Sequence, residues 1–202
     1  MTTVVAYQGE PGAFSEMAIL ALPVPDLEPL PCRRFEDVIE AVESGRAALG
    51  LLPTENSIAG PVADSVAAIA RSALVVAGTT ALGIHLALLA LPGATIDSLQ
   101  SVESHPVALR QCRRFLAAHP QLAPVESHDT AGAAREVAAS GNPARGAIAS
   151  SRAGQLNGLV ALATGLEDRA DNVTQFAIVA REESPILLRA LDGRRSPANL
   201  ER

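Results

Sequence analysis

The stretch ALGLLPTENS, residues 48–57, joins a short apolar run to a cluster of polar side chains. The run 48–52 has the length and composition of a buried strand, and Glu55, Asn56 and Ser57 follow it in a loop before the next helix. Loops that lead from a strand into a helix commonly carry catalytic and binding groups. The stretch therefore predicts one strand–helix unit of an α/β fold, ending either in a functional site or in a solvated loop.

Both flanks of this unit continue the alternation of strands and helices. Phe35, Val38, Ile39 and Val42 follow the i, i+3, i+4, i+7 spacing of an amphipathic helix, and Gly45 ends it. We expect strands at 3–7, 27–32, 48–52, 74–78, 82–90, 102–104, 122–126, 146–149 and 172–181, and helices at 15–22, 35–45, 60–70, 104–118, 129–140 and 150–158. Such alternation predicts a mostly parallel sheet. At its carboxyl edge the helix N-termini gather and can bind a small anion.

Composition narrows the chemistry. The chain has 202 residues, enough for one domain or two small lobes, and a formal net charge of −6 without a basic block, which disfavours nucleic-acid binding. It contains no Lys, which excludes Schiff-base catalysis and the P-loop lysine. Its four His and two Cys lack metal-ligand spacing, so we expect no metal, and we expect Cys32 and Cys112 to be reduced core thiols.

The N-terminal residues and the longest apolar segment indicate where in the cell the protein is expected to be found. The N-terminal residues lack the cationic and apolar regions of a signal peptide, which predicts a cytoplasmic protein. Residues 73–91 are apolar, but the Gly and Thr residues within them favour two buried strands over a membrane helix. The charged, Pro-containing segment 182–202 is expected to be a helical fragment or a frayed end, too short for another domain.

Two further polar clusters are candidate sites. Ser104 and Gln111 are seven residues apart, about two helical turns, and so share one face of the helix expected there. His105 could act as a general base or cap that helix, and we favour the cap because no orienting partner is evident. Thr174 stands where the last strand begins, where a Thr is also explained by β-propensity alone.

Five segments in order resemble the motifs of the prephenate dehydratase family. They are Gln8–Glu16, Leu52–Ser57, Ser104–Pro106 with Gln111 and Cys112, Asp129–Ala131, and Asn172–Phe176. The resemblance implies a two-lobed α/β fold like the type II periplasmic binding proteins, with a cleft between the lobes and chain crossings near 78–82 and 168–173. It implies a first lobe of residues 1–78 and 173–183, a second lobe of 79–172, and a short tail of 184–202.

The resemblance also implies an activity, the conversion of prephenate to phenylpyruvate, CO₂ and water without a cofactor. The catalytic residues would be Thr174, Glu55, Asn56 and Gln111. The substrate-binding residues would be Ser15, Ser57, Ser104, Gln175 and Phe176. Either Thr174 would hydrogen-bond the leaving hydroxyl, or Glu55 would protonate it if burial raised the pKa of its carboxyl group.

The implied partners are a small-molecule substrate, prephenate or arogenate, and further copies of the chain, with no nucleic acid and no membrane. The match covers the family's catalytic domain without its regulatory ACT domain, so feedback inhibition by phenylalanine is expected to be weak or absent. Gln175 stands where the family has Arg, and it either weakens carboxylate binding or points away from the cleft. A non-aromatising prephenate decarboxylase and a ligand-binding relative without catalysis are the alternatives.

Overall fold

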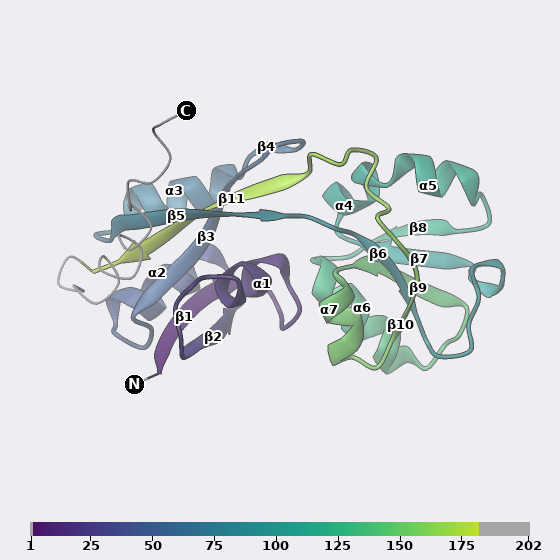
Figure 1. The fold of residues 1–202 in the computed structure, drawn as a ribbon, viewed down its shortest axis with the longest axis horizontal. Helices are drawn as coiled ribbons and strands as arrows, with labels where there is room; N and C mark the ends of the chain where they lie inside the picture. The colour runs from purple at the N-terminus through teal and green to yellow at the C-terminus, as the bar shows by residue number, and fades with distance from the viewer. Residues whose placement is uncertain (1, 182–202) are drawn as a thin grey trace, which may run out of the picture.

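The computed structural model describes residues 2–181, which form two lobes, each built on its own β-sheet (Figure 1). The first lobe contains β1 (Thr3–Gln8), α1 (Phe14–Leu20), β2 (Leu27–Cys32), α2 (Phe35–Glu43), β3 (Leu49–Asn56), β4 (Gly60–Pro61), α3 (Ala63–Arg71), β5 (Val75–Gly83) and β11 (Val173–Ala180). Its sheet has the order β2-β1-β3-β11-β5, and β4 pairs with β3 alone.

The second lobe holds the middle of the chain. It contains β6 (Ala87–Ala90), a 3₁₀ turn (Ile96–Ser98), β7 (Ser101–Ser104), α4 (Pro106–Gln111), α5 (Arg113–Ala118), β8 (Ala123–Glu126), α6 (Thr130–Ser140), β9 (Arg145–Ala149), α7 (Ser151–Leu156) and β10 (Val160–Thr164). The sheet order is β10-β6-β9-β7-β8. None of the helices within residues 2–181 is long and apolar enough to cross a membrane.

Each sheet is covered on both faces, because successive side chains of a strand point in opposite directions. In β3, Leu51 packs with Ile19 of α1, whereas Leu52 packs with Val38 of α2 on the other face. In β6, Leu88 packs in the cluster that includes α4, whereas Leu89 packs on the other face in the cluster that includes α6 and α7. Both lobes are therefore three-layered, and their cores consist mostly of buried aliphatic side chains.

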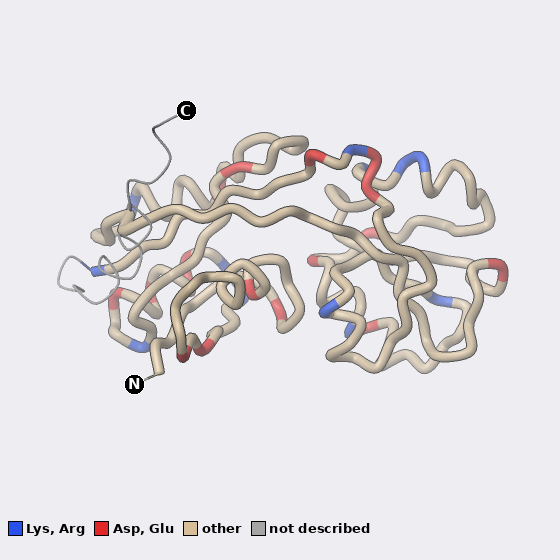
Figure 2. The backbone as a smooth tube through the Cα atoms, in the orientation of Figure 1, with Lys and Arg blue, Asp and Glu red and all other residues tan. Residues whose placement is uncertain are grey.

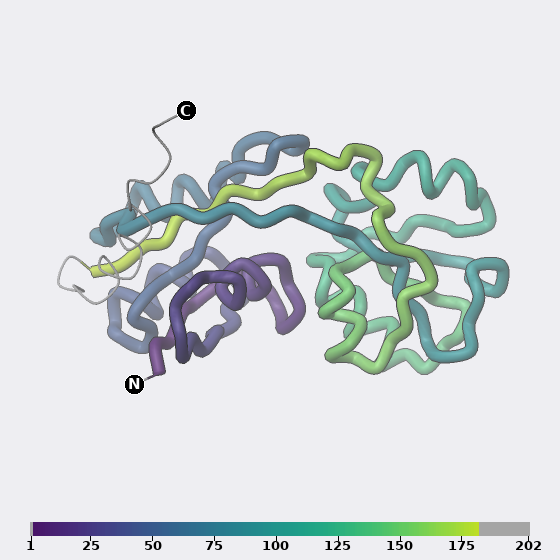
Figure 3. The backbone as a smooth tube through the Cα atoms, viewed as in Figure 1, coloured from purple at the N-terminus to yellow at the C-terminus, as the bar shows by residue number. Residues whose placement is uncertain are grey.

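The chain crosses between the lobes twice, at residues 84–86 and 165–172, and these segments run side by side (Figure 3). The amide of Ile84 donates to the carbonyl of Asn172 at 2.8 Å, and the amide of Leu166 donates to the carbonyl of Leu86 at 3.1 Å. Glu167 accepts from the Leu86 amide and contacts the His85 ring at 3.0 Å. Burial raises the pKa of Glu167, but these hydrogen bonds outweigh it and leave the pKa below its ordinary value.

Three expectations about the first lobe need correction, because β11 returns from the second lobe and lies antiparallel between β3 and β5. The sheet is mixed, not mostly parallel. Pairing with β11 extends β3 to Asn56, and Pro53 is tolerated because the register shifts beside it. The same pairing carries β5 to Gly83, so the crossing expected near 78–82 begins only at residue 84.

Other expected elements also differ. Gly60 and Pro61 form the short strand β4 instead of opening a helix, and α3 begins at Ala63. Strand β10 was not predicted, and β6, which pairs antiparallel with both β10 and β9, makes the second sheet mixed as well. Residues 182–202, including the predicted tail, lie outside the described residues.

The predicted helix 104–118 is broken at Cys112 by the second crossing segment. The amide of Asp168 donates to the carbonyl of Gln111 at 2.6 Å, and the Asp168 carboxylate accepts from the Arg114 amide at 2.9 Å. These contacts replace bonds that a continuous helix would make within itself. Cys112 and Cys32 are buried free thiols, as predicted.

Away from the crossings, the turn before α1 contacts α7 of the second lobe. The Ser150 hydroxyl donates to the carbonyl of Gly12 at 2.6 Å, and Arg152 donates to the buried Glu16 carboxylate at 2.6 Å. Glu16 also accepts from the Gly12 amide at 2.9 Å. Gly12 has φ +93°, and a Cβ there would lie 2.6 Å from Cα of Ala153. This position therefore requires glycine for both its backbone conformation and its closeness to the other lobe.

We predict that Gly12→Ala lowers the free energy of unfolding, measured by denaturant titration, at least twice as much as Gly60→Ala. Gly60 is the matched control, since it has φ +83° but nothing within 4 Å of an added Cβ. The control should lose about 1–2 kcal/mol for the left-handed backbone alone. Equal losses in the two variants would contradict a tight contact between the lobes at Gly12.

Candidate functional site

A cavity of about 740 Å³ lies between the two lobes, within the usual size range of small-molecule sites. Asn56 and Thr174 line it from the first lobe, Gln111 and His105 line it from the second, and Ser15 of α1 also reaches it. Phe14, Phe176, Ile84 and Leu86 supply apolar wall. The cavity therefore combines hydrogen-bonding groups with apolar surfaces.

The pairing of β3 with β11 sets two of the polar groups side by side. Thr174 lies directly opposite Asn56 in the register, so the two side chains share one face of the sheet. Nδ2 of Asn56 donates to Oγ1 of Thr174 at 3.0 Å. Oδ1 of Asn56 accepts from the amides of Ile58 and Ala59, which hold the Asn56 side chain in one orientation.

Gln111 joins this pair from the second lobe. It is the last residue of α4, at the break where Asp168 binds its carbonyl. Nε2 of Gln111 donates to Oδ1 of Asn56 at 3.2 Å, although the two residues lie 55 positions apart in the chain. The two side chains are only 8% and 9% exposed, so a hydrogen bond between the lobes is buried at the edge of the cavity.

The sequence analysis missed Asn172 as a member of this group. Its side chain accepts from Nδ2 of Asn56 at 2.8 Å and donates to Oε1 of Gln111 at 3.1 Å. It is 1% exposed, and its carbonyl also accepts from Ile84 in the first crossing. The signal was available, because Asn172 begins the last of the five quoted motifs, but a residue just before a strand gives no indication of where its amide points.

Five of the nine predicted site residues line the cavity: Ser15, Asn56, Gln111, Thr174 and Phe176. The structure does not bring the other four to it. Ser104 is fully buried, with its hydroxyl donating to the carbonyl of Ile148, and Ser57 binds the backbone of the second crossing at Asp171 and Val173.

Glu55 and Gln175 are register partners on β3 and β11, and both are exposed. They alternate with Asn56 and Thr174, so they point to the other face of the sheet. Among the described residues, neither lines the cavity. The catalytic role of Glu55 and the substrate-binding roles of Gln175, Ser57 and Ser104 stay predictions, without support from these positions.

His105 is the N-cap of α4, which confirms the capping interpretation. Its Nδ1 accepts from the Val107 amide at 3.2 Å. Burial, with the nearby Arg110 charge, lowers the pKa of its imidazole. A neutral ring is what this hydrogen bond needs, because a protonated Nδ1 could not accept. His105 therefore presents a neutral edge to the cavity.

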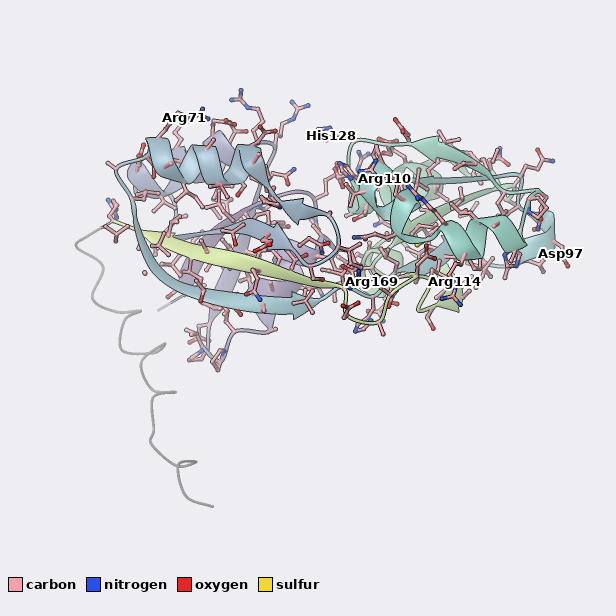
Figure 4. The ribbon with its side chains drawn as sticks, turned by 90° about the horizontal axis from the view of Figure 1, so that it is seen from above. Arg71, Asp97, Arg110, Arg114, His128 and Arg169 are labelled. Carbon is pink, nitrogen blue, oxygen red and sulfur yellow. The ribbon has the colours of Figure 1, made fainter. Side chains whose placement is uncertain are left out.

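Positive charge reaches the cavity from the first lobe, where Arg33, Arg34 and Arg71 are part of its lining. Arg34 is paired with Asp37 at 2.8 Å and Arg71 with Glu36 at 3.6 Å, whereas Arg33 makes no ion pair within residues 2–181. His128 lines the same cavity from the second lobe, on the edge that faces the first (Figure 4). The Arg33-Arg34 doublet before the helix at 35 was the sequence signal that we overlooked.

Charge elsewhere forms no continuous basic face: blue and red segments alternate over the described part of both lobes (Figure 2). Within residues 2–181, no three His, Cys, Asp or Glu side chains are grouped closely enough to hold a metal ion. The polar lining of the cavity therefore comprises amides, hydroxyls, Arg guanidinium groups, the imidazoles of His105 and His128, and the carboxylates of Glu36, Asp64 and Asp129.

Comparison with solved structures identifies the fold. A prephenate dehydratase from Arthrobacter aurescens, solved in complex with L-Phe, superposes with a TM-score of 0.82 at 29% identity, covering 89% of this chain and 60% of that one. A putative methionine-binding lipoprotein from Bacillus subtilis gives a TM-score of 0.52 at 13% identity over 95% of this chain and 89% of that one. The fold is the two-lobed one of periplasmic-binding-like proteins, as the resemblance implied.

Sequence comparison identifies the family. "Arogenate dehydratase 5, chloroplastic" from Arabidopsis thaliana is 41% identical over 186 residues, covering 92% of this chain and 43% of that protein. The chain thus spans less than half the length of this curated relative. A sequence model described as prephenate dehydratase matches residues 5–184. That match takes in both lobes, both crossings and the cavity between them, and so the chain belongs to the prephenate dehydratase family.

Proposed function

We propose that the cavity binds prephenate and converts it to phenylpyruvate. The observation that carries the proposal is the hydroxyl of Thr174, which lines the cavity and accepts a hydrogen bond from Asn56. In the reaction, the bond from the ring to its carboxylate breaks and CO₂ leaves. The electron pair of the broken bond moves through the diene and expels the ring hydroxyl, which takes up one proton and departs as water. Aromatisation of the ring drives the step.

The residues of the cavity fit what this reaction requires. A hydrogen-bond donor at the leaving oxygen stabilises the charge that develops there, and we assign this role to Thr174, which lines the cavity. Apolar wall from Phe14 and Phe176 keeps water from the carboxylate that is lost. Arg33 supplies a positive charge for a carboxylate. The amide side chains of Asn56, Asn172 and Gln111 are uncharged, which suits orientation of the substrate better than proton transfer.

Arogenate is the second candidate substrate, because the Arabidopsis relative is named an arogenate dehydratase. It differs from prephenate in carrying an amino group where prephenate has a keto group. The purified chain should therefore be assayed with each compound separately, following the absorbance of the aromatic product. Aromatic product from prephenate supports the proposal. If aromatic product forms from arogenate but not from prephenate, arogenate is the substrate. CO₂ release without an aromatic ring would indicate the non-aromatising decarboxylase instead.

We also propose, from the sequence, that the protein is cytoplasmic and forms a homo-oligomer. Size-exclusion chromatography with light scattering would measure the oligomeric state directly.

We predict that Thr174→Ala lowers kcat by about 10²–10³-fold, the usual effect of removing one preorganised donor. Thr174→Ser is the matched control, because it keeps the hydroxyl, and it should retain kcat within a few-fold. Circular dichroism melting should show both variants folded, since Thr174 is only half-buried. A folded Ala variant with wild-type kcat would remove Thr174 from the mechanism.

Arg33→Ala should raise KM by about 10- to 150-fold while kcat changes little, because a charge-assisted hydrogen bond contributes roughly 1.5–3 kcal/mol. The expectation rests on a charge without an ion-pair partner in the described part of the chain. Arg113→Ala, an exposed Arg on α5 that does not line the cavity, is the control and should leave KM unchanged. Equal KM for both variants would show that Arg33 does not bind substrate.

Gln175→Arg should leave KM unchanged, because this side chain lies on the face away from the cavity. Facing Glu55 across the strands, the new Arg should raise the free energy of unfolding by about 0.2–1 kcal/mol, as opposite charges do at such positions. Gln175→Glu should lower it instead, by placing two like charges opposite each other. A lower KM in the Arg variant would show that residue 175 does reach the substrate.

A further inference from the structure

Asn56, Asn172 and Gln111 form a closed ring of three side-chain amides, each donating to the next. Asn56 donates to Asn172, Asn172 donates to Gln111, and Gln111 donates back to Asn56. The three residues come from β3, the second crossing and α4. The ring therefore joins both lobes and one crossing segment at a single buried point beside the cavity.

The direction of every amide in the ring is determined by its neighbours. The backbone amides of Ile58 and Ala59 bind Oδ1 of Asn56, so its Nδ2 must face Asn172 and Thr174. Oδ1 of Asn172 accepts from Nδ2 of Asn56, and therefore Nδ2 of Asn172 faces Gln111. Oε1 of Gln111 accepts from Nδ2 of Asn172, so Nε2 of Gln111 faces Asn56.

This orientation leaves two protons without a partner among the described residues. Oγ1 of Thr174 accepts from Asn56, and no acceptor for the Thr174 hydroxyl proton lies within bonding distance in the described part of the chain. Nε2 of Gln111 has two protons and gives one to Asn56. Because both residues line the cavity, the remaining protons are available to a bound substrate.

We infer that Asn172 is a positioning residue: it fixes the amide of Gln111 against that of Asn56, so that Gln111 presents a donor to the substrate instead of an acceptor. Asn172 does not itself line the cavity, and it acts only through its two partners. The expected effect of Asn172 on turnover rests on the proposed dehydratase reaction. Its expected effect on the orientation of Gln111 rests on the hydrogen-bonded ring alone.

Asn172→Asp tests the inference, because the two side chains have the same shape. A protonated Asp can still accept from Asn56 and donate its O–H to Gln111, which preserves the ring. An ionised Asp offers only acceptors and repels Oε1 of Gln111. The Gln111 side-chain amide therefore rotates so that Nε2 faces the carboxylate. Burial at a site 1% exposed raises the pKa of a carboxyl group and brings this change into a measurable pH range.

The charged groups around this position are already engaged. Asp171 is paired with Arg169 at 2.6 Å, the Asp168 carboxylate accepts from the backbone amide of Arg114, and Glu167 on the same crossing contacts His85. Dividing the kcat of the variant by that of the wild type at each pH removes the titration of these groups from the comparison.

We expect this kcat ratio to lie within a few-fold of one at pH 5 and to fall to about one hundredth at pH 8, with KM little changed. Asn157→Asp is the matched control, since its amide donates to the carbonyl of Ala153 away from the cavity, and its ratio should not vary with pH. Melting temperatures measured at each pH identify any loss that comes from unfolding. A ratio independent of pH, or one that follows the folded fraction alone, would overturn the inference.

A second measurement needs no turnover. In ¹⁵N-labelled protein without substrate, the Gln111 side-chain amide resonances should shift with pH in the Asn172→Asp variant and remain constant in the wild type. Their midpoint should equal that of the kcat ratio. If the wild type acts on neither prephenate nor arogenate, the proposed function fails while this result still decides the role of Asn172. Unshifted Gln111 resonances would overturn that role.

Discussion

The insertion of β11 between β3 and β5 is the constraint on which the rest of the structure depends. It brings the end of the chain's second crossing back into the first sheet and pairs Thr174 with Asn56. A shift of one residue in this register would turn Thr174 away from the cavity and bring Gln175 into it. The shift beside Pro53, where one residue of β3 is left unpaired, is therefore as important to the site as the polar residues themselves.

A second set of contacts holds the lobes on the side away from the crossings. The Glu16 carboxylate is 9% exposed, and it accepts from both Arg152 and the Gly12 amide, while Glu10 pairs with Arg135 nearer to solvent. Breaking this pair would leave the largely buried Glu16 carboxylate without a compensating charge, which is costly, so the contact favours the observed arrangement of the lobes. The cavity is bounded by hydrogen bonds at the crossings and by ion pairs opposite them, and its groups are therefore preorganised.

Local patterns in the sequence predicted most elements of the fold, and they failed where distant segments meet. The helix around Val38, the cap at His105 and the helix expected at 129–140 depend on neighbours in the chain and were predicted. The extension of β3 and the break at Cys112 depend on β11 and Asp168, more than fifty residues away, and were not.

The candidate site divides in the same way. Motif resemblance gave Asn56, Gln111 and Thr174, which line the cavity, but it gave Glu55 and Gln175 equally, because a motif does not record which way a side chain points. Strand alternation separates the two groups only once the register is known. Asn172 and Arg33 escaped notice for another reason: one acts through side chains from other elements, and the other is a common surface residue until a cavity lies beside it.

The separation of charged from neutral groups around the cavity agrees with the proposed chemistry. A carboxylate that leaves as CO₂ loses its charge in the transition state, so a cation bound to it would stabilise the ground state more and slow the reaction. Neutral donors such as Gln111 and Thr174 bind less tightly a carboxylate whose charge is about to disperse, and in the proposed reaction they can also donate to the oxygen where charge develops. Arg33 extends from the segment between β2 and α2, three strands from β11, or about 14 Å at the usual strand spacing. In the proposed reaction, the Arg33 charge would bind the carboxylate that is retained, and it would contribute affinity without opposing the loss of the other.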